Sequence, residues 1–233
     1  RPPISHPSLP SPTHADSPAE PEERRTIAEI KAEIAAESVD FADQPIPGYM
    51  LERGFTSIAP VFRRAMRIAK DRFKNLSFLY YLPTEDGGVE LVSREKVGPN
   101  HFKNYLSRTR AGVWIAAPKD GQVDHIVICE APLDCISSRT ICGDGEATAY
   151  FALRSGAELA CVELVSRLIA KRGAGARIEI RTDNDPAGMS YAAKIALAFK
   201  KLDLVARYTA PPGWHEDWTE AQEASFAEHQ KSA

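Results

Sequence analysis

The chain has 233 residues, of which 43% are hydrophobic, and its 29 basic and 32 acidic side chains give a formal net charge of −3. The apolar fraction is sufficient for a packed core and excludes a wholly disordered chain. At about 100–200 residues per domain, the length fits one large domain or two small ones. The net charge excludes a uniformly basic protein, so a polyanionic partner must be met by a local basic patch or through metal ions.

Hydropathy and cysteine usage indicate the compartment. The longest apolar runs, such as 126–129, are far too short to cross a bilayer, so no membrane association is expected. The four cysteines have no C-x-x-C spacing, which is typical of free thiols in a reducing cytoplasm rather than of zinc or disulfides. The first residue is Arg1 and no charged-then-apolar leader follows it, so we expect a fragment of a longer cytoplasmic protein.

The amino-terminal 48 residues predict a linker followed by a short helix. Residues 1–25 are rich in Pro, Ser, Thr and Glu, a composition that buries too little apolar surface to offset its ordering entropy. A Pro-rich recognition segment is the alternative. Residues 26–37 carry three isoleucines at helical spacing, and a Pro-Ile-Pro-Gly sequence at 45–48 then interrupts the chain.

Residues 49–118 predict a small α+β module. An apolar face at helical spacing, formed by Phe62, Met66, Ala69 and Phe73, predicts an amphipathic helix. The neighbouring face of this helix would carry a basic stripe made of Arg63, Arg67, Lys70 and Lys74. Such a stripe is most often a solvated surface, but the acidic balance of the whole chain favours a nucleic-acid contact here.

A hairpin and a second basic run complete the predicted module. The segments 77–82 and 89–93 alternate like strands and are joined by Asp-Gly-Gly, which is a hairpin signal. Basic residues then recur, interleaved with aromatic ones, between positions 94 and 110: Arg94, Lys96, Lys103, Arg108 and Arg110, with His101, Phe102 and Tyr105.

The remaining chain, 123–228, alternates predicted strands and helices. The expected strands are 125–130, 148–153, 177–182 and 204–209, and the expected helices are 132–139, 155–171 and 186–202. This alternation favours an α/β fold with right-handed crossovers and a mostly parallel sheet flanked by helices.

Acidic residues follow two of these strands. Glu130 ends the first strand, Asp134 lies one helical turn beyond it, and Asp183 and Asp185 follow the third strand. Ligands of open parallel sheets bind at the carboxyl ends of the strands, so these carboxylates should converge. Unpaired carboxylates repel one another, and a cluster without His or Cys selects Mg²⁺ or Mn²⁺ over zinc. An Asp-x-Asp sequence alone is weak evidence for a metal site. An Asp-x-Asp sequence that comes after a strand-ending Glu is stronger evidence.

In this order the motifs resemble the Toprim domain of topoisomerases, bacterial primases and related nucleases. The segment 126–134, Ile-Val-Ile-Cys-Glu-Ala-Pro-Leu-Asp, matches its first motif except that Ala131 replaces a glycine. The segment 181–188, Arg-Thr-Asp-Asn-Asp-Pro-Ala-Gly, matches the second. The segment 215–220, His-Glu-Asp-Trp-Thr-Glu, is similar to the Lys-Asp-Trp-Asn-Glu sequence that closes Toprim domains of plasmid and phage proteins. Residues 49–118 resemble a module that precedes such domains in mobile-element proteins.

The resemblance implies a Rossmann-like Toprim fold and a chemistry. Asp183 and Asp185 would hold Mg²⁺ or Mn²⁺, and Glu130 would act as general acid or base as well as a metal ligand. Asp134 would either position metal-bound water or cap the following helix. The partners would be single-stranded DNA and nucleotides, with the oligomeric state open.

Three functions are compatible with the resemblance. The first is primase-like nucleotidyl transfer in plasmid replication or mobilisation. The second is metal-dependent nicking of DNA, as in Toprim nucleases. The third is a DNA-binding module that keeps the fold without catalysis.

Overall fold

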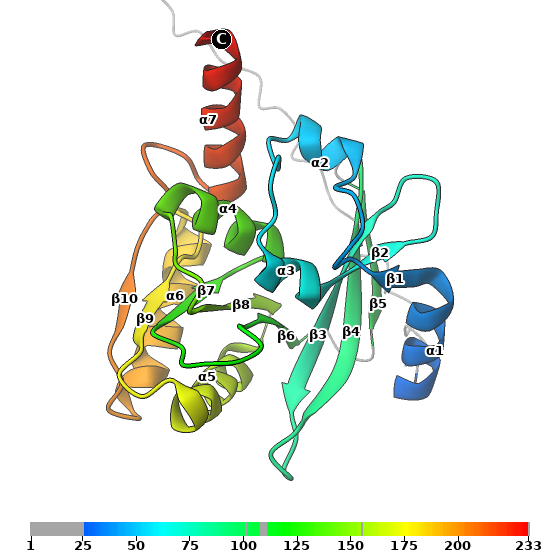
Figure 1. Cartoon of the computed structure of the whole chain (residues 1–233). Helices are drawn as coiled ribbons and strands as arrows, with labels where there is room; N and C mark the ends of the chain where they lie inside the picture. Colours follow the sequence, from blue (N-terminus) through cyan, green and yellow to red (C-terminus); the bar gives the residue numbers. More distant parts are fainter. Residues whose placement is uncertain (1–25, 101, 108–110, 155, 233) are drawn as a thin grey trace, which may run out of the picture.

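The computed structural model describes residues 26–100, 102–107, 111–154 and 156–232 (Figure 1). The predicted linker 1–25, and His101, Arg108 and Arg110 of the second basic run, lie outside these ranges. The first half contains α1 (Ile27–Glu37), β1 (Ser38–Asp40), α2 (Gly48–Glu52), α3 (Pro60–Ala65), β2 (Met66–Ala69), β3 (Leu76–Pro83), β4 (Val89–Val97), β5 (Lys103–Ser107) and β6 (Gly112–Ala116). The second half contains β7 (His125–Cys129), α4 (Pro132–Cys142), β8 (Thr148–Arg154), α5 (Glu158–Arg172), β9 (Arg177–Ile180), α6 (Pro186–Lys200), β10 (Ala206–Tyr208) and α7 (Trp218–Ser232).

The strands of the described residues form one sheet. Eight of them follow the order β1-β2-β3-β6-β8-β7-β9-β10, and β4 and β5 continue from β3. The strands β8, β7, β9 and β10 are parallel, as predicted, and β6 joins them by running antiparallel to β8. The predicted α/β class is confirmed. The sheet continues across the predicted boundary between 118 and 123, and the division into two domains stays a prediction.

The two faces of the parallel part are covered by different helices. On β7, Val127 and Cys129 pack toward α4, whereas Ile126 and Ile128 pack toward α5 and α6. Side chains of a strand alternate between the faces of its sheet, so an unbroken apolar run is what burial on both faces requires. The position of β7 between β8 and β9 fixes where the residue after it, Glu130, is presented.

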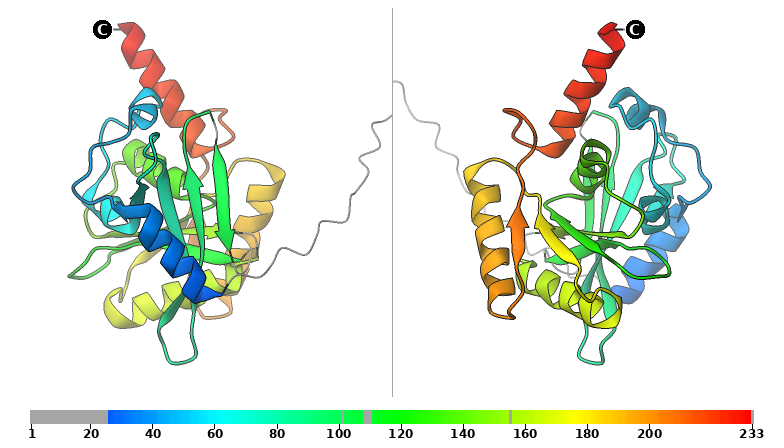
Figure 2. Two further views of the ribbon diagram at one scale, coloured as in Figure 1. Left: turned by 90° about the vertical axis from the view of Figure 1, so that its right-hand side faces the viewer. Right: turned by 60° about the vertical axis from the view of Figure 1, so that its left-hand side comes forward.

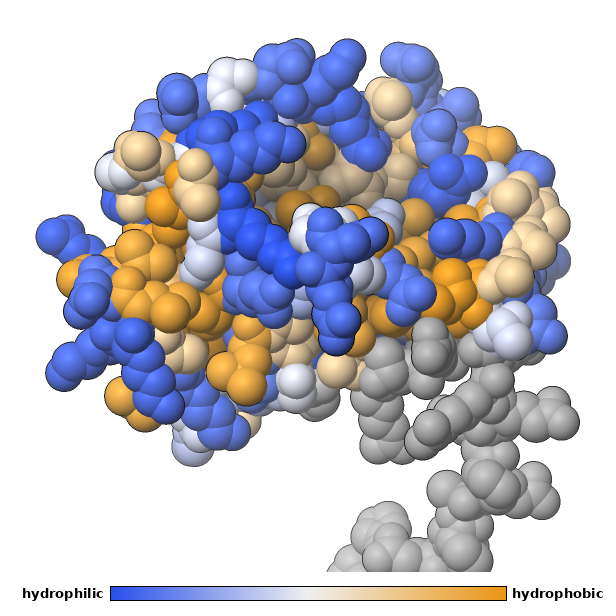
Figure 3. Space-filling model, turned by 90° about the horizontal axis from the view of Figure 1, so that it is seen from below, coloured by the Kyte–Doolittle hydropathy of each residue, from blue (hydrophilic) through white to orange (hydrophobic). Residues whose placement is uncertain are grey.

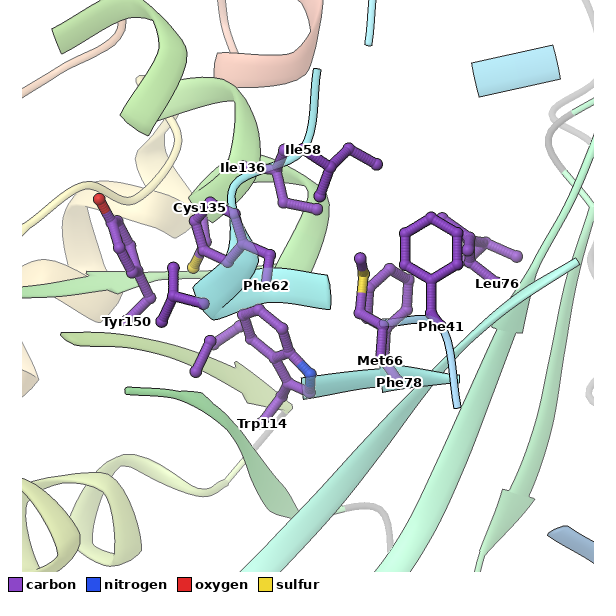
Figure 4. Close-up of a cluster of buried hydrophobic side chains, with 14 of the residues drawn as sticks. Phe41, Ile58, Phe62, Met66, Leu76, Phe78, Trp114, Cys135, Ile136 and Tyr150 are labelled. Atoms are coloured by element: carbon purple, nitrogen blue, oxygen red, sulfur yellow. The ribbon is translucent and has the colours of Figure 1, made fainter. Parts of the chain in front are cut away.

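The core between the first half of the chain and the parallel strands is shared (Figure 4). Phe62 of α3 lies 4.7 Å from Tyr150 of β8 and 6.1 Å from Trp114 of β6, measured between ring centroids. Phe78 of β3 meets Trp114 edge-on at 5.8 Å. Aromatic pairs at these separations add to the stabilisation from burial, so the two halves are held rigidly together.

The helix predicted within 26–37 exists and covers a sheet face. Thr26 and Glu29 form a capping box at the start of α1. Ile30 and Ile34 of this helix pack against Leu91 of β4, and Figure 2 shows α1 lying across these strands. The helix is therefore part of the folded body.

The predicted helix over 62–73 is wrong beyond Ala65. From Met66 the chain is strand β2, which pairs with β1 on one side and with β3 on the other. Pairing with two strands satisfies backbone groups that a helix would satisfy internally, and it overrides the helical spacing of the apolar residues. The predicted hairpin of 77–82 and 89–93 is confirmed as β3 and β4.

None of the helices in the described ranges is long and apolar enough to cross a bilayer. All four cysteines are free, as predicted. Seen from below, the end of the molecule opposite α7 shows hydrophobic patches separated by hydrophilic residues (Figure 3).

Candidate active site

The two predicted acidic motifs meet at the carboxyl ends of β7 and β9. These strands are parallel neighbours, with Ile128 beside Ile180, so the residues that follow them emerge at one edge. Glu130 Oε1 accepts a hydrogen bond from the backbone N–H of Asp183 at 3.1 Å. The sequence therefore placed Glu130 and Asp183 together correctly.

Gly188 allows the helix after the second motif to approach Glu130 closely. A Cβ atom at position 188 would lie 2.7 Å from Glu130 Oε1 and 2.2 Å from the carbonyl oxygen of Asp183. Asp185 is the N-cap of α6, and its Oδ1 accepts from the Gly188 N–H at 2.6 Å. Asp185 thus orients the strand-to-helix turn, and its other carboxylate oxygen stays available to a ligand.

Asp134 has helix-capping contacts. Its Oδ2 accepts from the backbone N–H of Ala131 at 3.2 Å, and its Oδ1 accepts from the hydroxyl of Thr219 at 2.9 Å. The side chain is almost fully buried. The pKa of Asp134 is raised to about 7, mainly by burial; the charge of Asp217 contributes to the increase, and the hydrogen bond from Thr219 opposes it. Of the two roles predicted for Asp134, these contacts correspond to the capping of helix α4.

A fifth carboxylate, Asp217, was missed as a site residue by the sequence reasoning. It directly precedes α7, where its Oδ1 accepts from the backbone N–H of Glu220 at 2.6 Å. The only signal was its place in the segment 215–220. The hydroxyl of Thr219 reaches Asp134 and thereby fastens α7 beside α4. We call Glu130, Asp134, Asp183, Asp185 and Asp217 the acid cluster.

The acid cluster is electrostatically uncompensated. The pKa of Asp183 is raised to about 8, mainly by burial and also by the negative charges of the other four carboxylates of the cluster. Burial also raises the pKa of Glu130, and the charge of Asp185 adds to this effect. Asp183 Oδ1 is buried without a hydrogen-bond partner. A buried acceptor with raised pKa and no donor fits a cation.

A cleft of about 460 Å³ opens onto the acid cluster. It lies between residues of the first half of the chain on one wall and the acid cluster with α7 on the other. The lining comprises Arg53, Val97, Gly98, Phe102, Lys103, Glu130, Ala131, Leu133, Asp134, Asp183, Asp217, Thr219, Glu220 and Glu223. The lining contains two basic residues, Arg53 and Lys103, against six carboxylate residues, and Arg53 is paired with Glu223 at 2.6 Å.

The donors of the acid cluster suit Mg²⁺ or Mn²⁺ in chemistry, since all are carboxylate oxygens. Within the described residues, however, no three His, Cys, Asp or Glu side chains are already arranged to hold a metal ion. Several oxygens are instead occupied by N–H and O–H donors. The orphaned Oδ1 of Asp183 is the atom that most clearly fits such a group.

Three of the four residues predicted to bind nucleic acid have partners within the chain. Arg63 donates to the carbonyl oxygens of Ile58 and Gln44. The guanidinium of Arg67 contacts Asp40 and Ser38, and Lys70 donates to the carbonyl oxygen of Ala36. Because the helix ends before position 66, Arg63, Arg67, Lys70 and Lys74 do not form a helical stripe. Their contact with DNA stays a prediction.

A family model and the structure of a phage primase fragment agree with this architecture. Residues 127–222 match a family model described as Toprim-like. The crystal structure of the primase fragment of the bacteriophage T7 primase-helicase protein is similar over 85% of this chain and 75% of that chain, with a TM-score of 0.52 and 14% identity. The RNA polymerase domain of primase DnaG from Mycobacterium tuberculosis has 17% identity and a TM-score of 0.46, covering 87% and 81% of the two chains. The comparison with curated proteins found no match.

Proposed function

Residues 127–222 form a Toprim-like domain, and on this premise we propose that the protein is a Mg²⁺- or Mn²⁺-dependent nucleotidyl transferase that makes primers on single-stranded DNA. The observation that carries the proposal is the acid cluster, whose buried Asp183 Oδ1 has no donor and whose cleft also holds Lys103. Plasmid replication or mobilisation is the process we propose. The free cysteines support a reducing, cytoplasmic setting.

The residues that would hold the cation are Asp183 and Asp185, with Glu130 and Asp134 beside them. When bound, the cation would neutralise phosphate oxygens and so let an acidic site accept a polyanion. Asp134 and Asp217 cap α4 and α7, and these contacts fix the walls of the site. Their part in the reaction is to keep the carboxylates in place.

Glu130 is the residue that we assign to proton transfer. Its pKa is raised above the ordinary value of 4.5, mainly by burial, and this brings the carboxyl group nearer to the working pH. Its Oε1 is oriented by the Asp183 N–H and enclosed by Gly188, so the carboxyl group is positioned before any substrate arrives. A preoriented carboxyl group of this kind can take the proton from a primer hydroxyl.

Lys103 is the cation that we assign to substrate phosphates. It is exposed in the cleft at the start of β5. By contrast, Arg63, Arg67 and Lys70 have donors committed to this chain's own oxygens. A primary ammonium group facing carboxylates is a natural phosphate contact once a divalent cation offsets their charge.

The test is primer synthesis by the longest available form of the protein, measured as labelled nucleotide incorporation on single-stranded DNA. We expect Glu130→Gln to lower the rate by about 10²–10⁴-fold while DNA binding is kept, since one general acid–base group contributes that much. Glu85→Gln, in the exposed turn between β3 and β4, is the control with the same chemical change.

The assay also separates the alternative functions. Supercoiled plasmid under the same conditions reports nicking, and its conversion without nucleotide incorporation would favour a nuclease. If neither reaction depends on Mg²⁺ or Mn²⁺ and DNA still binds, the protein is a binding module. Wild-type rates for Glu130→Gln would contradict the assigned proton transfer.

A further inference from the structure

An exposed tryptophan lies in the loop that joins β10 to α7. Trp214 is 81% exposed, whereas the other two tryptophans of the chain, Trp114 and Trp218, are almost completely buried. A large aromatic side chain left in water loses the stabilisation that burial would give it. Single exposed apolar residues are common on proteins, so the surroundings of Trp214 decide whether it has a role.

The loop is tied at one end to the second acidic motif and at the other end to β9, the strand that precedes this motif. The backbone N–H of Asn184, which lies between Asp183 and Asp185, donates to the carbonyl oxygen of Glu216 at 2.7 Å. At the other end, the backbone N–H of Thr209 donates to the carbonyl oxygen of Ile180 at 2.9 Å. Two residues of extended chain span at most about 7 Å, so Trp214 stays close to the Asn184 anchor.

One side of the indole is supported by the neighbouring imidazole. The rings of Trp214 and His215 have centroids 4.5 Å apart and an interplanar angle of 32°. His215 itself is mostly covered, with a side chain 15% exposed and its Nδ1 3.7 Å from Glu220 Oε1 on α7. An indole supported on one side by a fixed ring and otherwise exposed offers its free face to another flat group.

A second aromatic side chain flanks the same edge. Tyr208, at the end of β10, is 41% exposed, and its hydroxyl donates to the carbonyl oxygen of Asp183 at 3.4 Å. Tyr208 and Trp214 thus bracket the loop that adjoins the acid cluster. Rows of exposed aromatic residues beside a phosphate site are the arrangement on which unpaired bases stack.

Resting on the proposed function, we propose that Trp214 is a stacking platform for an unpaired nucleobase of single-stranded nucleic acid whose phosphates enter the acid cluster. Stacking tolerates every base, because each has a π face, so the contact carries little sequence preference. The platform holds the strand and takes no part in proton transfer.

The three tryptophans make the first test direct. In Mg²⁺ buffer, a single-stranded oligothymidylate should quench the fluorescence of the exposed Trp214, and an abasic sugar-phosphate oligomer of equal length should not. The buried Trp114 and Trp218 provide a constant background. Equal quenching by both oligomers would overturn stacking on a base.

The second test measures affinity through a dye on the oligothymidylate, independently of tryptophan emission. Trp214→Ala should weaken binding by about 5- to 150-fold, which is the range of base–aromatic stacking. Trp214→Phe should restore most of the affinity. Val205→Ala is the matched control, since Val205 is also 81% exposed and lies just before β10. An unchanged affinity for Trp214→Ala overturns the platform.

Failure of the platform is distinguishable from failure of the proposed function. Base-dependent quenching without primer synthesis would support the stacking platform and contradict the proposed primer synthesis. Primer synthesis with no quenching would remove the platform alone. If Trp214→Ala leaves oligothymidylate binding intact but abolishes a self-association seen by sedimentation, the exposed indole is a protein contact and the platform is overturned.

Discussion

Two groups of charged side chains lie on or beside strands β7 and β9, and they differ in how they are neutralised. In the charge network of His125, Asp144, Glu179 and Arg181, the opposite charges are paired within the chain. Arg181 donates to both carboxylate oxygens of Asp144 at 2.7 and 2.9 Å and to Glu179 at 2.8 Å. The acid cluster, by comparison, gathers carboxylates whose contacts are N–H and O–H donors, and none of the five forms an ion pair among the described residues.

The same type of side chain therefore titrates in opposite directions at the two places. Burial raises the pKa of a carboxyl group, but hydrogen bonds from Arg181 and Thr209 lower that of Glu179 to about 2. Burial and neighbouring carboxylates raise that of Asp183 to about 8. A paired network stabilises the fold by itself, whereas a cluster of like charges needs a cation from outside. The comparison separates residues that hold the structure from residues that serve a ligand.

The largest expected effect is the loss of Arg181. Arg181→Met should lower the free energy of unfolding by about 3–5 kcal/mol, because it leaves Asp144 buried and unpaired. Urea denaturation measures this loss. Arg207→Met, an exposed arginine on β10, is the matched control and should change stability little. A loss below about 1 kcal/mol, as for a surface ion pair, would contradict the buried character of the network.

A substitution in the acid cluster should change the free energy of unfolding in the opposite direction. In metal-free buffer, Asp183→Asn should raise the free energy of unfolding on the order of 1 kcal/mol, after allowance for solvent screening, because the amide removes the cost of burying a carboxyl group among several like charges. The same variant should lose the increase in melting temperature that Mg²⁺ or Mn²⁺ gives the wild-type protein. Asp43→Asn, at an exposed position, is the control. Destabilisation by Asp183→Asn would show that this carboxylate is compensated within the chain.

Local sequence patterns were sufficient to predict that two residues of the acid cluster, Glu130 and Asp183, lie together. An unbroken apolar run marked β7, isoleucines at alternating positions lie in β9, and the residues after parallel neighbouring strands must share an edge. The meeting of Glu130 and Asp183 followed from that rule. The strand–helix alternation and the hairpin of β3 and β4 were predictable for the same reason, since each depends on short-range periodicity.

The charge network, the boundary between α3 and β2, and the role of Asp134 depend on contacts between residues far apart in the sequence. Arg181 finds Asp144 across 37 positions, and nothing local to either residue indicates the pair. The switch from α3 to β2 is set by pairing with β1 and β3, which helical spacing cannot reveal. Likewise, the capping contacts of Asp134 require Thr219, so spacing alone left its role open.

The smallest expected effect is on the acid side of the pH profile. The pKa of Glu179 is about 2 in the folded protein against an ordinary 4.5, so the folded state binds fewer protons than the unfolded state between these values. Its contribution to stability is fully present above pH 4.5 and is lost as the pH falls toward 2. We therefore expect the urea midpoint of the wild-type protein to fall more between pH 5 and pH 3 than that of Glu179→Gln, which has no proton to bind there.

The difference should be modest because the Glu179 side chain is 19% exposed and partly screened by water. Glu85→Gln, in the exposed hairpin turn, controls for the exchange of a carboxyl group for an amide, and it should keep the wild-type response. Parallel profiles for wild type and Glu179→Gln would mean that Arg181 serves Asp144 alone and that Glu179 lies outside the paired network.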